Sequence, residues 1–92
     1  MNREQTLKKA IEMVTGHREE DYGSPEDSFD LIARLWGDYL NRRITAVDVS
    51  AMMALLKIAR IGTGVATDDS WIDLAGYAAC GGEIAAKGRK HG

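Results

Sequence analysis

The chain has 92 residues, of which 45% are hydrophobic and 28% are charged, and its net charge is −2. These values are typical of one small globular domain, and the lack of a broad basic field argues against a protein that binds nucleic acid non-specifically. The single cysteine, Cys80, excludes an intramolecular disulfide. The sequence shows no signal peptide and no apolar run of 18 residues, so we expect a cytoplasmic protein with no membrane partner.

Apolar residues at helical spacing, a single proline and few β-branched clusters predict an all-α fold of four helices in one domain, 1–92. The first helix is expected over about 3–18, with Asn2 and Gln5 as a capping box. The second is expected over about 25–41. It has the clearest start signal, because Ser24 can cap it and a proline follows directly.

The third helix is expected over about 46–61. Thr45 can cap it, and Asp48 at the third helical position completes a capping box in which aspartate replaces glutamate. The helix is apolar on nearly all sides, which is typical of a buried central helix. Gly62 is expected to end it.

The fourth helix is expected over about 68–87, followed by a basic tail over 88–92. Its middle consists of small residues: Ala75, Gly76, Ala78, Ala79, Gly81 and Gly82. Each interior glycine costs a helix about 1 kcal/mol, so three of them indicate the close approach of another helix or of a ligand. With short loops, the four helices predict a helical bundle.

Two aspartates on the fourth helix form the first candidate site. Asp69 and Asp73 are four residues apart, so one helical face can present both carboxylates to a hard cation such as Mg²⁺. Asp69 can equally serve the helix start, where negative charge is favourable. Asp73 lies one turn further in, where no cap explains it, which indicates either a functional role or a buried ion pair.

Two cations on the third helix form the second candidate site. Lys57 and Arg60 are three residues apart and could together hold a phosphate. The alternatives are a favourable position near the helix C-terminus and a salt bridge to Asp69 or Asp73 on the next helix. These interpretations are compatible, because a charge network can line a site.

Several further residues are weaker candidates. Asp30 could join a metal site, and Asp48 is explained by capping or by a charge network. Tyr22, Phe29 and Tyr77 could contact a base or another part of a ligand, although an aromatic residue beside a helix start is more often part of the packing.

The order of motifs resembles a family of small proteins of unassigned function that is common in bacteriophages and prophages. The match covers about residues 17–86 and is carried by Arg18, Tyr22-Gly23, Phe29, Ile32–Trp36, Asp48-Val49, Met52-Met53, Leu56–Arg60, Asp69, Asp73 and Ala75–Ala79. More distantly, the layout resembles the MazG-type all-α nucleoside-triphosphate pyrophosphohydrolases. Those enzymes carry two paired acidic motifs, E-x-x-E and E-x-x-D. The nearest counterparts in this chain are the pair Asp27 and Asp30 and the pair Asp69 and Asp73.

The resemblance implies a MazG-like helical bundle that forms a homo-oligomer in the bacterial host cytoplasm. It also implies a Mg²⁺ ion that holds a triphosphate while water attacks and pyrophosphate leaves. We therefore expect a site between the second, third and fourth helices, with Asp69, Asp73 and Asp30 on the metal and Lys57 and Arg60 on the phosphate.

Three hypotheses follow for the function. The first is a protein that binds a nucleotide or related phosphate compound, with Mg²⁺-dependent pyrophosphohydrolase activity. The second is a non-catalytic protein that sequesters a nucleotide, for example a host immune signalling nucleotide. The third is a helical interaction protein without a ligand, whose charges form salt bridges only.

Overall fold

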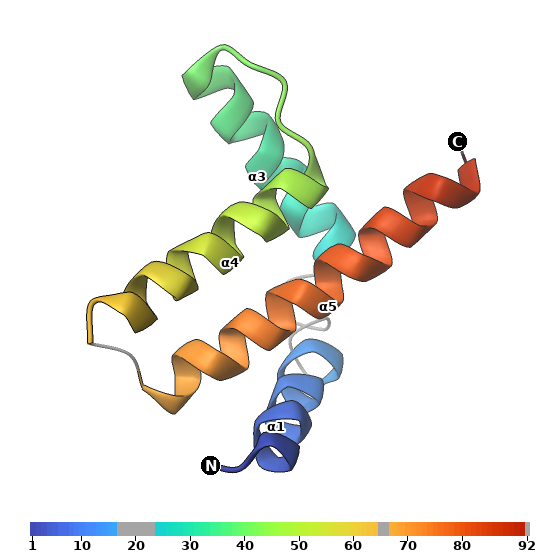
Figure 1. Ribbon diagram of the computed structural model, residues 1–92. Helices are drawn as coiled ribbons and strands as arrows, with labels where there is room; N and C mark the ends of the chain where they lie inside the picture. Colours follow the sequence, from blue (N-terminus) through green and yellow to red (C-terminus); the bar gives the residue numbers. More distant parts are fainter. Residues whose placement is uncertain (17–23, 65–66, 92) are drawn as a thin grey trace.

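The computed structural model describes residues 1–16, 24–64 and 67–91, and over these residues the chain is all-helical with four helices and no strand (Figure 1). The helices are α1 (Arg3–Thr15), α3 (Pro25–Leu40), α4 (Ala46–Gly62) and α5 (Asp68–His91). The expectation of an all-α fold is therefore confirmed.

Side-chain caps begin three of the helices where the sequence predicts them. Asn2 and Gln5 form the capping box of α1, and the Ser24 hydroxyl accepts a hydrogen bond from the Asp27 amide at the start of α3. In α4 the Asp48 amide donates to Thr45 Oγ1 at 3.1 Å, and the Thr45 amide donates to Asp48 Oδ2 at 2.9 Å. These bonds satisfy amides that a helix start leaves without partners.

The helix ends differ from the expected ones at several points. α1 stops at Thr15, where Gly16 caps it, three residues before the expected end. α4 includes Gly62, and the left-handed residue that follows it is Gly64, with φ of 77°. α5 continues through most of the expected basic tail to His91, because lysine and arginine are good helix formers and favour a helix C-terminus.

α5 packs against all three other helices, whereas α4, the expected buried central helix, packs chiefly against α3 and α5. The α5 helix lies along α4, with which it forms an antiparallel hairpin (Figure 1). The core lies where α3, α4 and α5 meet and contains Phe29, Ala33, Ala46, Val49 and Cys80. On α4 the buried residues cluster in the first turns, and most of its large apolar side chains remain exposed.

The small residues of α5 serve close helix packing, as predicted, at two of the three central glycines. A Cβ at Gly76 would lie 3.3 Å from Val14 Cγ1, so this glycine admits α1. A Cβ at Gly81 would lie 2.9 Å from the Ser50 Cβ, so that glycine admits α4. Gly82 has no described atom within 4 Å of its missing Cβ. The two packing glycines therefore let α5 contact both neighbours closely.

Candidate functional site

The α4–α5 hairpin brings the two predicted charge pairs together near its loop. Lys57 and Arg60 lie near the end of α4, and Asp69 and Asp73 lie in the first turns of α5. Because the two helices run antiparallel, these four residues share one end of the hairpin. We call this set the hairpin charge cluster.

Lys57 and Asp73 form the centre of the hairpin charge cluster. Lys57 Nζ lies 3.1 Å from Asp73 Oδ2, and the two side chains are 18% and 29% exposed. One of the sequence alternatives, a salt bridge between the neighbouring helices, is therefore present. Partial burial strengthens such a pair relative to a surface ion pair, because water screens it less.

Arg60 on α4 and Asp69 on α5 each lie about one turn nearer the loop than this pair, and both are exposed. Neither side chain makes an ion pair or a side-chain hydrogen bond with another residue in the described part of the chain. Asp69 lies in the acidic first turn of α5, where it also complements the helix dipole. The cluster thus combines one internally neutralised pair with one cation and one anion that solvent can reach.

Asp30 lies on α3, outside the α4–α5 hairpin, and is exposed. Within residues 1–16, 24–64 and 67–91, no three acidic, histidine or cysteine side chains lie close enough together to hold a metal ion. A cation at this site would therefore need ligands in addition to the described carboxylates of Asp69 and Asp73.

The candidate aromatic contacts have different positions. Phe29 is buried in the core, and its ring centroid lies 6.1 Å from that of Tyr77 at a tilt of 32°. Tyr77 is half-buried, and its backbone carbonyl accepts a hydrogen bond from the Ser50 hydroxyl. Tyr22 lies outside the described residues. The structure therefore brings Phe29 and Tyr77 together as one aromatic pair between α3 and α5.

Asp48 lies at the opposite end of α4 from the hairpin charge cluster. Its carboxylate accepts the Thr45 amide hydrogen bond, so the capping interpretation accounts for it. Its side chain is exposed, which leaves its second oxygen accessible to a partner.

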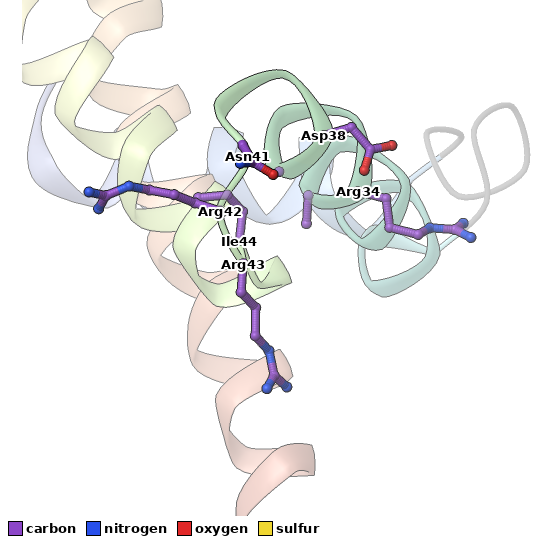
Figure 2. A pocket seen from close by; sticks show the side chains of 8 residues that line it. Arg34, Asp38, Asn41, Arg42, Arg43 and Ile44 are labelled. Atoms are coloured by element: carbon purple, nitrogen blue, oxygen red, sulfur yellow. The ribbon is translucent and has the colours of Figure 1, made fainter.

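A shallow pocket of about 450 Å³ lies at the turn between α3 and α4, at a position that the sequence did not single out. Arg34, Arg42 and Arg43 line it together with Asp38 (Figure 2). Figure 2 shows that the three arginine side chains extend in different directions, so they do not converge on one ligand. In the sequence, two adjacent arginines that follow a helix end, Arg42 and Arg43, are the feature that could have indicated this basic pocket.

A second, mostly apolar depression of about 650 Å³ lies between α1 and α5. Leu7, Trp71 and Leu74 contribute to its lining. Trp71 is 52% exposed and thus lies outside the core.

The fold and the sequence together define an all-helical member of one protein family. Over residues 5–85 the chain matches the family described as a domain of unknown function, DUF6378, and it belongs to that family. The expected relationship to small phage proteins is confirmed by two relatives, whereas the relationship to MazG-type enzymes remains a prediction.

The two relatives are phage proteins of greater length. The chain is 44% identical over 78 residues to the Gene 55 protein of Mycobacterium phage D29. The aligned region covers 84% of this chain and 51% of the relative. It is 42% identical over 73 residues to the Gene 55 protein of Mycobacterium phage L5, and this aligned region covers 78% of this chain and 47% of the relative. The chain therefore spans about half the length of these curated relatives. No solved structure matches it.

Among the described residues, no helix combines the length and the apolar character needed to cross a membrane.

Proposed function

We propose that this chain is a MazG-like, oligomeric protein that binds a nucleotide or a related phosphate compound at the hairpin charge cluster. The observation that supports this proposal is the Lys57–Asp73 ion pair, which lies near the hairpin end, about one turn from an exposed cation, Arg60, and an exposed anion, Asp69. A phosphate can replace the Asp73 carboxylate beside Lys57, since both are oxygen anions that an ammonium group binds. The planar guanidinium of Arg60 can then bind a second phosphate oxygen.

Asp69 and Asp73 are the residues that would hold Mg²⁺ in this proposal. They fit such an ion in number and chemistry, because Mg²⁺ in nucleotide sites is bound through one or two carboxylates plus phosphate oxygens and water. When bound, the ion would neutralise part of the negative charge of the phosphate. Release of Asp73 from Lys57 would free its carboxylate for the cation, so the two charges of the pair would exchange partners together.

The base of the nucleotide would lie against Tyr77, which is half-buried beside Phe29. Phe29 would support the Tyr77 ring rather than stack on the base itself, since Phe29 is buried. Tyr22 is the other proposed stacking residue.

We propose binding as the primary activity and Mg²⁺-dependent pyrophosphate release as the second candidate. Two carboxylates at one hairpin end are enough for one ion, whereas the MazG-type pattern supplies two acidic pairs on two helices. This small acidic set favours a protein that retains and sequesters its nucleotide over one that hydrolyses it rapidly.

A nucleotide panel tests the proposal. Canonical, modified and cyclic nucleotides are titrated by calorimetry with and without Mg²⁺, and the nucleotide recovered afterwards is analysed. Binding with intact recovery supports sequestration. Release of pyrophosphate that requires Mg²⁺ and disappears in Asp73→Asn supports the enzyme. Absence of binding by every phosphate compound contradicts the proposal.

Matched variants locate the site. Lys57→Met and Arg60→Gln are expected to weaken binding at least tenfold each, because each removes a charge-assisted contact to phosphate. Lys8→Met and Glu83→Gln are the controls, since both residues are exposed and lie outside the cluster. Equal weakening by the controls would show a diffuse charge effect and contradict the assignment of the site.

A further inference from the structure

The orientation of α4 is the reverse of that of an ordinary surface helix. Its one charged residue between Val49 and Ala59 is Lys57, which points toward α5 and is 18% exposed. Leu55, on the opposite side of the helix, is 63% exposed. The same outward side presents further large apolar side chains that are more than one-third exposed: Val47, Met52, Leu56 and Ile58. A soluble helix normally presents its polar side to water, so this apolar face indicates a covering partner.

The accessible surface of the chain is also larger than that expected for a compact monomer of this mass. A monomer of this mass is expected to expose about 5,300 Å², whereas the chain exposes 6773 Å². Its radius of gyration is 13.9 Å, compared with about 12.3 Å for a compact domain of this length. The excess of about 1,500 Å² per chain is enough surface for one side of a stable interface, since obligate interfaces bury at least about 2,000 Å² over both partners.

We propose that the outward face of α4 packs against the same face of α4 in a second copy of the chain, with the two helices antiparallel. An apolar face without like charges can pair with itself, as a two-fold symmetric contact requires. The charges that flank the apolar stretch set the direction. Asp48 lies at its N-terminal end and Arg60 at its C-terminal end, so an antiparallel pair brings opposite charges together and a parallel pair brings like charges together.

This interface deepens the oligomeric part of the proposed function and links it to the site. In the antiparallel pair, Asp48 of the second copy approaches Arg60, which is part of the hairpin charge cluster. The second copy therefore contributes an acidic residue beside the proposed phosphate site. Association is measured without any nucleotide, so a failure of this inference is distinguishable from a failure of ligand binding.

The mass of the chain in solution is the first test. Wild type is expected to sediment at twice 10.1 kDa, and Leu55→Glu at the mass of one chain, with unchanged helical circular dichroism because the side chain is exposed within one copy. Leu7→Glu is the control, since Leu7 is 58% exposed on α1 and is expected to leave the dimer intact. A monomeric wild type, or a dimer that survives Leu55→Glu, would overturn the proposal.

Disulfide cross-linking tests the direction of the helices. Cys80 is buried, so a cysteine introduced on the outward face is the reactive thiol. Leu55→Cys, near the midpoint of α4, is expected to form a cross-linked dimer on mild oxidation. Val47→Cys is expected not to, because an antiparallel pair separates its two copies by about 20 Å. Efficient cross-linking of Val47→Cys would overturn the antiparallel arrangement.

Discussion

The Ser50 side chain lies directly against Gly81, and the Ser50 hydroxyl donates a hydrogen bond to the Tyr77 carbonyl one turn earlier on the same helix. One side chain of α4 thus contacts a carbonyl of α5 and also fills the space that a Cβ at Gly81 would occupy. The contact lies next to Val49, which is fully buried. It sets the distance between the two helices that carry the hairpin charge cluster.

Gly81→Ala is expected to destabilise the protein, because its Cβ would lie 2.9 Å from the Ser50 Cβ and force the helices apart. Overpacking of this kind costs about 1–3 kcal/mol. Gly82→Ala is the matched control: its Cβ would meet no described atom, so the better helix propensity of alanine should stabilise by about 0.5–1 kcal/mol. Urea unfolding measures both free energies, and equal effects at the two positions would contradict the packing.

The Lys57–Asp73 ion pair is expected to show a clear coupling energy. Asp73→Asn should cost about 1–3 kcal/mol, because it leaves a largely covered ammonium without its anion. A double-mutant cycle with Lys57→Met should then give a coupling of about 1–2 kcal/mol. The exposed Glu4–Lys8 pair is the control, with an expected coupling of about 0.3–0.5 kcal/mol. Couplings of the same size would mean that burial contributes nothing to the first pair.

At the end of α4, alanine substitutions at two nearby glycines, Gly62 and Gly64, are expected to have opposite effects on stability. Gly64 has φ of 77°, whereas Gly62 is helical with open space around it. Gly64→Ala should therefore destabilise by about 1 kcal/mol, since a Cβ is strained in the left-handed region. Gly62→Ala should stabilise by up to about 1 kcal/mol. Thermal unfolding of the two variants measures the difference, and the opposite order would place the helix end at Gly62.

The start of α4 depends on the Thr45 hydroxyl. Thr45→Ala is expected to lower the free energy of unfolding by about 1 kcal/mol, because the Asp48 amide loses its acceptor. Thr45→Ser keeps the acceptor and should change stability by only a few tenths of that amount. Chemical denaturation with both variants is the measurement, and an equal loss in Thr45→Ser would indicate that the Thr45 methyl group, not its hydroxyl, stabilises this end.

Helix starts were predictable from the sequence because capping is a local interaction. Ser24 and Thr45 each accept a hydrogen bond from an amide three residues away, and no distant contact is needed for this. Helix ends were less predictable. Gly62 has the residue type of a helix end, but the chain remains helical there and turns at Gly64, where nothing in residue type distinguishes the two glycines.

The orientation of α4 could not be predicted, and this limited the prediction of the site. A helix that is apolar on nearly all sides has no polar face that marks the side exposed to water. The expected burial of α4 was wrong for this reason, because most of its large apolar side chains are exposed. The Lys57–Asp73 pair was among the alternatives that the charges suggested, whereas the position of Asp30 depends on how α3 packs, which no local pattern determines.

The contact of α1 with α5 has a consequence for folding. Gly76 accommodates Val14, which precedes it by roughly 60 residues, whereas α4 and α5 are adjacent in the sequence. Closing a long loop costs more chain entropy than closing a short one, so contacts between distant segments form late. The α4–α5 hairpin should therefore form early and α1 should dock last. Native-state hydrogen exchange should accordingly show α1 opening at a lower free energy than α4 and α5.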